Sequence, residues 1–385
     1  MPMHVLVLPS WYGTTDKPWL GTFFKSQAVA LSRRGVQVGV VFVESRSLRR
    51  LTIPKLFETH FQKEISIDNG VTTLRMKGWN TLSQTLPGSR VWSTLTRHLI
   101  HDYCQRYGKP DILHAHCAFW AGSAAVDTAA GLGIPAVVTE HGSDFLGDAL
   151  DSRRRQRAAE IYRRADAVLA VSGMLLSSVS AIAGCRLGPV VPNMVDTDFF
   201  TIPPTLRGSR PFTFLSVSNL VESKRIDLLI QAFARLSGGD AQARLVVAGA
   251  GPCQVALRRL AESLGIAQSV EFTGSLSPEQ VRDRMWRSNA LVLPSSYETF
   301  GVVLIEALAT GLPVVATRCG GPQEILADGV GHLIDRNNEP QLSAALQWVM
   351  RQSPDEKRLR EHVLKRFSYH AVVPQLLEVY ESVLR

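Results

Sequence analysis

The sequence has few cysteines and no long apolar run. Its five cysteines are Cys104, Cys117, Cys185, Cys253 and Cys319. None forms a Cys-x-x-Cys pair, a pattern typical of reduced thiols rather than of a disulfide framework or a zinc site. No apolar run approaches the roughly 20 residues that cross a bilayer, and Val5–Leu8 is too short for the core of a signal peptide. We therefore expect a cytoplasmic protein, soluble or peripheral on the inner face of the cytoplasmic membrane.

Several motifs of common nucleotide-binding enzymes are also missing. There is no Gly-x4-Gly-Lys-Ser/Thr phosphate loop, and no Ser-His-Asp set has an interpretable spacing. Gly249-Ala250-Gly251 resembles the start of the dinucleotide fingerprint, but Gln254 stands where the third glycine belongs. This disfavours a dehydrogenase, although the two glycines still permit close approach of the backbone to a ligand. Basic residues are spread without interleaved aromatic residues, which disfavours a nucleic-acid-binding protein.

Two runs contain metal-binding side chains, and we interpret both as structural. The first is His114-Ala115-His116-Cys117, whose two histidines we expect to point to opposite faces if a strand continues through them. The second is Asp196-Thr197-Asp198, an acidic pair near an expected linker rather than at the end of a sheet. We therefore predict no metal site and no cofactor.

The 385 residues are enough for two α/β domains. Short aliphatic runs alternate with amphipathic stretches, which predicts parallel sheets covered on both faces. The alternation pauses at Pro203–Pro211 and then restarts. We predict two Rossmann-like, doubly wound domains facing across a cleft: residues 1–200, onto which a C-terminal helix of about residues 366–385 packs back, and residues 201–365.

The expected elements follow from this alternation. The strands are Val5–Leu8, Gln37–Val43, Asp111–His114, Ala136–Thr139, Ala167–Val171, Thr213–Val217, Arg244–Ala248, Val270–Thr273, Ala290–Pro294 and Pro313–Thr317. The helices are Phe23–Arg34, Arg225–Leu236, Cys253–Leu264, Pro278–Arg287, Phe300–Thr310 and about Val363–Arg385.

A net charge of +8 predicts an anionic partner such as phosphate or a lipid headgroup. Two basic stretches in the first domain contribute to it, and a solvated basic face is the alternative interpretation of both. One stretch interleaves Arg46, Arg49, Arg50 and Lys55 with apolar residues, although Pro54 interrupts any continuous helix; the other comprises Arg153, Arg154, Arg155, Arg157, Arg163 and Arg164. We predict that they dock the protein on an anionic membrane surface.

Polar residues follow the expected strands at the positions where open α/β sheets bind ligands. Glu298 precedes an expected helix and Glu306 lies inside it. The start of that helix suits a diphosphate, and the two carboxylates can accept hydrogen bonds from ribose and sugar hydroxyls. Lys224 follows another strand and can neutralise phosphate charge. In the first domain, His141 follows a strand and is placed to face a cleft.

These residues belong to longer motifs of a known family. Residues 295–321, SSYETFGVVLIEALATGLPVVATRCGG, resemble the signature of the retaining GT-B glycosyltransferases of family 4, including its Glu-x7-Glu motif. The stretches PSWYG at 9–13 with GTFF at 21–24, HGSD at 141–144, VPNMVDTDFF at 191–200 and AGAGP at 248–252 fit the same family in order. The resemblance covers nearly the whole chain. It implies a metal-independent transfer of sugar from a nucleotide-diphosphate sugar to a glycan or lipid-linked acceptor, in the synthesis of a bacterial surface polysaccharide.

The resemblance also implies residue roles. Glu298 would hold hydroxyls of the donor sugar, Lys224 would neutralise the departing diphosphate, and His141 would approach the sugar from the other domain. Glu306 would bind the ribose. The other donor-binding residues would be Phe300, Gly301 and Val302 through their backbone N–H groups, Thr273 and Gly274 near the base, Gly21 near the phosphates, and Gly249 and Gly251.

One position departs from the family's pattern. Asn219 stands five residues before Lys224, where the family usually has an arginine. An arginine fork makes two hydrogen bonds to phosphate, whereas asparagine brings no charge. We expect Asn219 and Arg225 to line the phosphate site. Two outcomes stay open: Arg225 compensates for the missing arginine, or the enzyme is slow.

Two other functions stay open. A GT-B nucleotide-sugar epimerase shares the fold but uses no acceptor, so activity with and without an acceptor separates the two. A degenerate nucleotide-sugar-binding protein is favoured only by Asn219, whereas the retained Glu298, Glu306, Lys224 and His141 argue against it.

Overall fold

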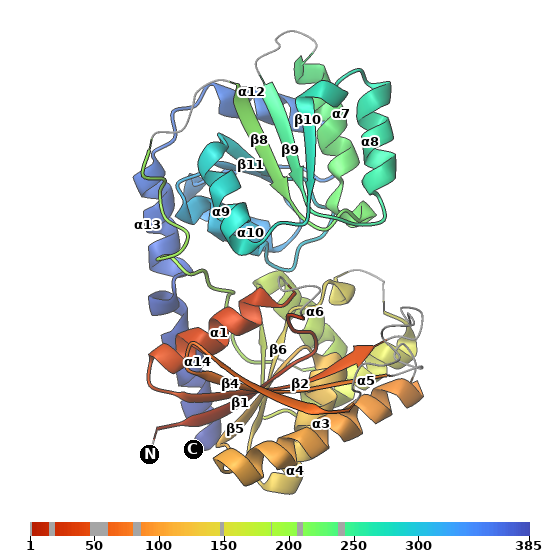
Figure 1. Ribbon diagram of the computed structural model, residues 1–385, viewed down its shortest axis with the longest axis vertical. Helices are drawn as coiled ribbons and strands as arrows, with labels where there is room; N and C mark the ends of the chain where they lie inside the picture. The colour runs from red at the N-terminus through yellow and green to blue at the C-terminus, as the bar shows by residue number, and fades with distance from the viewer. Residues whose placement is uncertain are drawn as a thin grey trace. The chain divides into compact units, whose positions relative to one another are not determined.

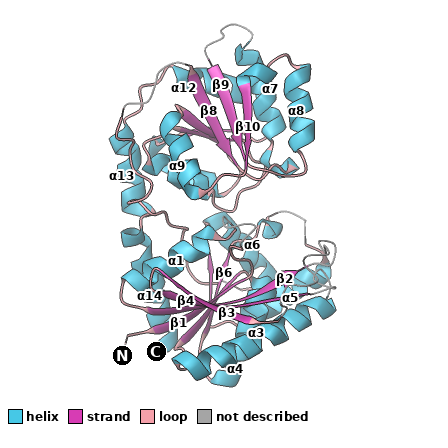
Figure 2. Cartoon of the chain, viewed as in Figure 1, coloured by secondary structure: helices cyan, strands magenta, loops and turns pink. Residues whose placement is uncertain are grey.

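The computed structural model describes residues 2–14, 20–46, 61–79, 86–146, 150–185, 187–205, 211–237 and 243–385. Contacts divide the chain into two units, Met1–Pro192 with Val373–Arg385, and Asn193–Val372. Each unit is a mainly parallel sheet with helices on both faces (Figures 1 and 2). The predicted fold class is confirmed.

The first unit is built on a seven-stranded sheet in the order β3-β4-β2-β1-β5-β6-β7. Its strands are β1 (His4–Pro9), β2 (Gln37–Arg46), β3 (Lys63–Asp68), β4 (Val71–Trp79), β5 (Ile112–His116), β6 (Ala136–Glu140) and β7 (Ala167–Ala170). Its helices are α1 (Thr22–Arg33), α3 (Leu86–Tyr107), α4 (Ser123–Leu132), α5 (Ser152–Arg164) and α6 (Gly173–Ala183). The central strand β1 is buried throughout and pairs in parallel with β2 and β5. A strand enclosed in this way needs an unbroken aliphatic run, which Val5–Leu8 supplies.

The hairpin of β3 and β4 differs from the all-parallel sheet that the sequence predicts. β3 pairs antiparallel with β4 and forms the edge of the sheet. Asn69 and Gly70 connect the strands, with φ values of 49° and 78°. Two consecutive residues with positive φ form the tight turn that Asn-Gly favours between antiparallel strands. The Asn69-Gly70 dipeptide was therefore a sequence signal for this antiparallel hairpin.

The second unit has a six-stranded, wholly parallel sheet in the order β10-β9-β8-β11-β12-β13. Its strands are β8 (Phe212–Val217), β9 (Ala243–Ala248), β10 (Val270–Gly274), β11 (Ala290–Leu293), β12 (Val314–Thr317) and β13 (His332–Ile334). Its helices are α7 (Ile226–Ser237), α8 (Gln254–Ser263), α9 (Pro278–Arg287), α10 (Val302–Ala309), α11 (Gly321–Ile325), α12 (Glu339–Met350) and α13 (Glu356–Arg366). Helix α7 packs its buried Leu229 and Phe233 against Phe214 of the central strand β8 in one core cluster.

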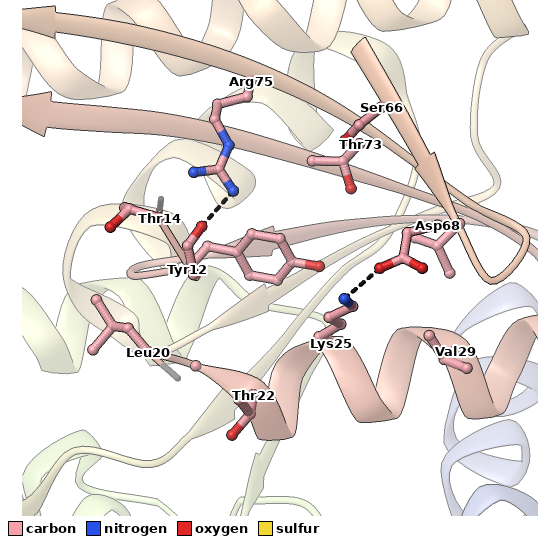
Figure 3. Close-up of a pocket in the computed structure, with 13 residues that line it drawn as sticks. Tyr12, Thr14, Leu20, Thr22, Lys25, Val29, Ser66, Asp68, Thr73 and Arg75 are labelled. Carbon is pink, nitrogen blue, oxygen red and sulfur yellow. Dashed lines mark hydrogen bonds and ion pairs between the residues drawn. The ribbon is translucent and has the colours of Figure 1, made fainter. Parts of the chain in front are cut away.

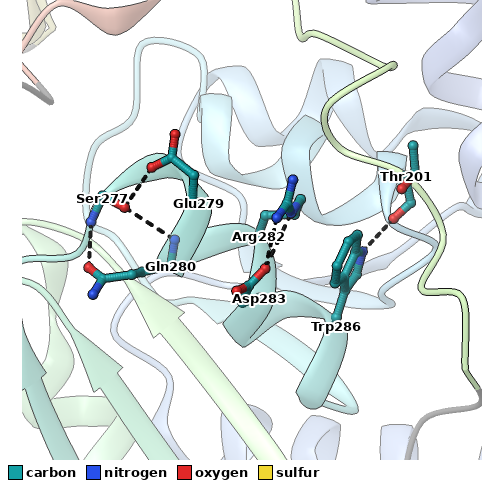
Figure 4. Close-up of polar contacts among 7 residues, drawn as sticks. All are labelled: Thr201, Ser277, Glu279, Gln280, Arg282, Asp283 and Trp286. Atoms are coloured by element: carbon teal, nitrogen blue, oxygen red, sulfur yellow. Dashed lines mark hydrogen bonds and ion pairs between the residues drawn. The ribbon is translucent and has the colours of Figure 1, made fainter.

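Helix α9 has the bounds that the sequence predicts, because its start carries strong local signals (Figure 4). Ser277 caps the helix by accepting from the backbone N–H of Gln280 at 3.3 Å, and the Gln280 side chain accepts from the Ser277 backbone at 2.9 Å. This reciprocal capping box satisfies two N–H groups that the helix itself leaves unpaired.

The boundary between the units lies at Pro192, eight residues before the boundary expected at residue 200. The segment that follows is held by side chains of the second unit. Trp286 donates to the carbonyl of Thr201 at 2.6 Å (Figure 4), and Arg360 donates to the carbonyls of Phe200 and Thr197, each at 2.7 Å. Because these bonds fix its backbone, residues 193–201 belong to the second unit by contact.

The C-terminal region forms two helices where the sequence predicts one. Helix α13 ends at Arg366, and Phe367 and Ser368 separate it from α14 (Tyr369–Leu384). The Ser368 hydroxyl accepts from the backbone N–H of Ala371 at 3.2 Å and so starts the new helix. The residues from Val373 onward belong to the first unit, where Tyr380 is fully buried. Within the described ranges, no helix combines the length and apolar character needed to cross a membrane.

Candidate functional site

Lys224 and Glu298 meet at the carboxyl ends of two neighbouring strands of the second unit. Lys224 follows β8 and Glu298 follows β11, and these strands pair in parallel. The Lys224 Nζ lies 2.5 Å from Glu298 Oε1, and Ser295 Oγ donates to the same oxygen at 3.0 Å. Both charged side chains are largely enclosed, with 21% of Lys224 and 13% of Glu298 exposed. The structure thus pairs two predicted catalytic residues that are 74 positions apart in sequence.

The backbone around Glu298 is held by two other loops, those after β12 and after β8. Its N–H donates to the carbonyl of Cys319 at 3.2 Å, and its carbonyl accepts from Gly321 at 3.0 Å. Ser296 donates to the carbonyl of Ser223, next to Lys224, at 2.8 Å. Gly321 has no freedom to carry a side chain, because a Cβ there would lie 2.2 Å from Phe300 Cα. This network positions both members of the pair before any ligand binds.

Helix α10 begins at Val302, two residues later than predicted. Gly301 caps it with a φ of 99°, outside the helical region, so the helix cannot extend back to Phe300. The first N–H groups of a helix have no partner within it, and they carry the positive end of the dipole. Phe300 itself is buried. The predicted donor-binding residues 300–302 therefore form a helix start of the kind that binds phosphate.

Glu306 lies on the second turn of α10 and is partly buried. Among the described residues, no group forms a hydrogen bond or ion pair with its carboxyl. Burial raises the pKa of Glu306 from 4.5 to about 7. A carboxyl group without a partner in a partly enclosed position is typical of a site that a ligand completes.

The glycines predicted to approach a ligand lie close to neighbouring backbone. A Cβ on Gly249 would lie 1.8 Å from the carbonyl oxygen of Ser218, and one on Gly251 would lie 2.3 Å from that of Leu220. Gly249 also donates to the carbonyl of Gly274 at 2.8 Å. The glycines hold together the loops after β8 and β9 and the end of β10, the strand to which Thr273 belongs.

Asn219 and Arg225 flank Lys224 on the loop after β8. Asn219 is exposed. The backbone N–H groups of its neighbours Ser218 and Leu220 donate to the carbonyls of Ala248, at the end of β9, and of Ala250, just after it. The Arg225 guanidinium donates to both carboxylate oxygens of Asp227, at 3.0–3.3 Å, and to Asn337. Arg225 is therefore engaged within the protein and would have to leave Asp227 to compensate for the missing arginine.

In the first unit, Glu140 is the last residue of β6 and His141 follows it directly. The Glu140 carboxylate is fully buried and accepts four hydrogen bonds. Three come from the backbone N–H groups of Ala118, His141 and Gly142, at 2.8–2.9 Å, and one comes from the Tyr162 hydroxyl at 2.8 Å. Sequence reasoning missed Glu140, although a carboxylate directly before His-Gly at a strand end was a readable signal.

The prediction that His114 and His116 point to opposite faces of the strand was wrong. Residues two apart on a strand share a face, and the two rings lie 4.5 Å apart between centroids. His114 bonds to the Tyr380 hydroxyl at 2.7 Å and to Thr139 at 2.8 Å, while His116 Nδ1 lies 3.0 Å from His141 Nε2. In the described part of the chain, no group of three or more His, Cys, Asp or Glu side chains has a geometry that could hold a metal ion.

Asp196, in the acidic run Asp196-Thr197-Asp198, forms hydrogen bonds within its own turn. Asp196 Oδ1 accepts from the backbone N–H groups of Asp198 and Phe199, at 3.0 and 3.1 Å. These bonds close a turn of the kind that aspartate side chains commonly form.

A cavity of about 210 Å³ lies in the first unit between α1 and the β3–β4 hairpin (Figure 3). Gly21, at the start of α1, lines one end of it. Its charges are paired: Lys25 contacts Asp68, and Arg75 donates to Glu44 at 3.1 Å and to the Gly13 carbonyl at 2.5 Å. The hydroxyl-bearing residues Tyr12, Ser66 and Thr73 also line it. A polar cavity with balanced charge suits a neutral, hydroxyl-rich ligand.

The chain thus has two α/β units, and the second carries a lysine–carboxylate pair and a helix start at its strand ends, where open α/β sheets bind ligands. Residues 20–199 match the family model described as Glycosyltransferase Family 4, and residues 200–366 match the one described as Glycosyl transferases group 1. The chain belongs to the group 1 GT-B glycosyltransferases, as the sequence predicts.

Proteins similar in sequence to the chain also carry the names of glycosyltransferases. The chain is 32% identical over 198 residues to the phosphatidylinositol N-acetylglucosaminyltransferase gpi3 subunit of Schizosaccharomyces pombe, a match that covers 50% of the chain and 43% of that protein. The chain thus spans less than half the length of this relative. It is 26% identical to TuaC of Bacillus subtilis, whose name links it with teichuronic acid biosynthesis, over 89% of the chain and 88% of that protein.

Solved structures share the fold over the whole chain. The sucrose-phosphate synthase of Thermosynechococcus elongatus superposes with a TM-score of 0.77 at 18% identity, over 99% of the chain and 98% of that structure. HepE of Anabaena, solved in complex with UDP-glucose, superposes with a TM-score of 0.73 at 18% identity, over 99% of the chain and 100% of that structure.

Proposed function

We propose that the protein transfers a sugar from a nucleotide-diphosphate sugar to a glycan or lipid-linked acceptor, with retention of configuration and without a metal, in the synthesis of a bacterial surface polysaccharide. The observation that carries this proposal is the Lys224–Glu298 pair at 2.5 Å, on strand ends beside the start of α10. The complex of HepE with UDP-glucose and the name of TuaC support the donor class and the product class, respectively.

In this proposal the second unit binds the donor. The N–H groups at the start of α10 and the Lys224 ammonium face the diphosphate, and the Glu306 carboxylate accepts hydrogen bonds from the ribose. An ammonium has three donors, so Lys224 can reach a phosphate oxygen while it keeps its bond to Glu298. The lone pairs that Glu298 does not use for Lys224 and Ser295 are then free for sugar hydroxyls.

The chemical step exchanges one bond for another at the sugar's anomeric carbon. The bond to the diphosphate oxygen breaks, the bond to the acceptor oxygen forms on the same face of the sugar, and the proton of the acceptor hydroxyl passes to the departing diphosphate oxygen. Negative charge grows on the leaving diphosphate. Lys224 and the fixed dipole of α10 stabilise that charge without moving, and such preorganised electrostatics are usually the largest part of catalysis. This is the reason for proposing that no metal is required.

The first unit would bind the acceptor. Its cavity between α1 and the β3–β4 hairpin, about 210 Å³, is smaller than the roughly 300–1,000 Å³ of pockets for drug-sized ligands. It therefore fits a single sugar ring rather than a longer glycan. His141, at the end of β6, would contact the transferred sugar.

The test is transfer from UDP-, GDP- and ADP-sugars to mixed acceptors, with and without excess EDTA. We expect an α-linked product from an α-linked donor, at a rate that chelation leaves unchanged. Donor turnover without any acceptor would support an epimerase instead. Loss of transfer with EDTA and its recovery with Mn²⁺ or Mg²⁺ would refute metal independence.

A further inference from the structure

Two buried histidines face each other at the ends of neighbouring strands of the first unit. His116 closes β5 and is fully buried, and His141 follows β6 with 8% of its surface exposed. His116 Nδ1 lies 3.0 Å from His141 Nε2, so one of these nitrogens carries a proton and the other accepts it. The two remaining nitrogens, His116 Nε2 and His141 Nδ1, are buried and have no partner among the described residues.

Both rings are neutral near pH 7. Burial lowers the pKa of His141 to about 3 and lowers the pKa of His116 well below 6.5, with nearby histidines adding to the effect. A neutral imidazole has one N–H and one lone pair. The direction of the shared bond therefore fixes the whole pair: if His116 donates, His141 carries its proton on Nδ1, and if His141 donates, its Nδ1 is a bare lone pair.

The surroundings of the two rings favour one direction. The His116 ring packs against Phe24 and His114, each with a centroid distance of 4.5 Å. If His116 Nε2 carried the proton, its N–H would be enclosed among these rings without an acceptor. Buried N–H groups without an acceptor are rarer than buried acceptors without a donor. The His141 ring keeps 8% of its surface exposed, whereas His116 keeps none, and His141 lies at the strand end, where ligands of open α/β sheets bind. A ligand oxygen therefore has a route to an N–H on His141 that it lacks to one on His116.

We propose that His116 is a positioning residue for His141. Its Nδ1–H donates to His141 Nε2, keeps the His141 proton on Nδ1, and makes that nitrogen a hydrogen-bond donor to an oxygen of the transferred sugar. The contact with the sugar rests on the proposed function, whereas the state of the histidine pair is a property of the free protein. Glu140 complements this arrangement, since it fixes the backbone of His141 and Gly142 while His116 fixes the ring.

His114 provides a matched control. It lies on the same face of β5, is fully buried like His116 and is in ring contact with it. Both of its nitrogens are used, by Tyr380 and Thr139, and neither bonds to His141. A substitution there disturbs the same core without removing the bond to His141.

The experiment measures the tautomer of His141 by ¹⁵N NMR of the histidine-labelled full chain, with the signal assigned from His141→Gln. We expect the wild type to be protonated at Nδ1. His116→Phe should move the proton at least partly to Nε2 and lower kcat about tenfold, with the KM of donor and acceptor within about twofold. His116→Asn, whose amide N–H can stand in for Nδ1–H, should restore both, and His114→Phe should leave the tautomer unchanged.

A wild-type His141 protonated at Nε2 would overturn the proposal, as would a His116→Phe variant with unchanged tautomer and kcat. If His116→Phe fails to fold, the proposal is still tested by the His141 tautomer in the wild type and by the tautomer and kcat of His116→Asn. If His141→Gln transfers sugar at the wild-type rate, the contact of His141 with the sugar is wrong, and the NMR result still tests the histidine pair.

Discussion

The carboxyl of Glu306 is the residue whose ionisation most directly links stability to ligand binding. Its pKa of about 7 in the folded chain stands above the ordinary value of 4.5. A raised pKa means that the contribution to stability is fully present below about pH 4.5 and is lost as the pH rises through 7. The proposed ribose contact needs the charged carboxylate, and this is therefore the form that destabilises the folded protein when no ligand is bound.

We expect Glu306→Gln to change stability in a pH-dependent way. The variant should match the wild type near pH 4.5 and exceed it at pH 8, by on the order of 1–3 kcal/mol, because glutamine has no charge to bury. Urea unfolding at both pH values measures this difference. The same variant should bind nucleotide more weakly. A stability difference that does not vary with pH would show that Glu306 is not desolvated as described.

Asn219 stands where the family usually has an arginine, and restoring the arginine tests the role of that position. Its side chain is exposed while its backbone is fixed on both sides, so an arginine can be accommodated there. Asn219→Arg should keep or raise kcat/KM, by up to about a hundredfold, since a charge-assisted hydrogen bond contributes roughly 1.5–3 kcal/mol. Asn219→Gln is the control without charge and should stay near wild type. A large loss in the arginine variant alone would mean that the loop does not face the phosphates.

At the scale of elements, the packing of the loops after β8, β9 and β10 determines where Lys224 lies. Gly249 has a φ of 134°, and a Cβ there would lie 1.8 Å from the Ser218 carbonyl oxygen. Because Ser218 and Leu220 precede Lys224 on the same loop, displacing them would also displace the ammonium from Glu298.

Gly249→Ala should therefore destabilise the protein by about 3 kcal/mol or more, from backbone strain and overpacking together. Gly265→Ala is the matched control. It has a φ of 72° but open space around its Cβ, so it should cost only about 1–2 kcal/mol. Denaturant unfolding compares the two variants. Equal losses would mean that the close approach to Ser218 relaxes without cost.

The sequence predicts elements well where the signals are local. Helix α9 has its predicted bounds because Ser277, Pro278 and Gln280 specify its start. Helix α10 begins later than predicted because the φ of Gly301 cannot be read from residue type. Lys224 and Glu298 could be predicted as separate strand-end residues, but their contact depends on which strands are neighbours. The bond between His116 and His141 was missed through a wrong assignment of strand faces.

At the scale of the whole molecule, net charge bears on where the enzyme works. Arg49, Arg50 and Lys55 lie outside the described residues. The other basic stretch lies on α5, where Arg154 pairs with Asp144, Arg157 donates to Ser89 and Arg164 pairs with Asp127. Several of these arginines are thus already engaged. A membrane contact remains a prediction that rests on the net charge of +8 and the first basic stretch.

We expect the protein to pellet with anionic vesicles at low salt, and to pellet less as salt rises. Each basic residue near an anionic surface contributes about 1 kcal/mol, and screening shortens its reach. Neutral vesicles are the control. A chain that stays in solution with anionic vesicles at low salt has no such membrane contact, and its transferase assignment is unaffected.

The most direct test of the account is thermal unfolding of the full chain with a panel of UDP-, GDP- and ADP-sugars. A ligand at about 100 times its Kd stabilises a protein by about 2.7 kcal/mol, which raises the Tm of a domain of this size by roughly 5–10 °C. We predict that the sugars of one nucleotide raise the Tm in this way, and that Lys224→Ala and Glu306→Ala each lose most of the shift. If no nucleotide sugar raises the Tm, or if both variants are protected as well as the wild type, the strand ends of the second unit are not the donor site.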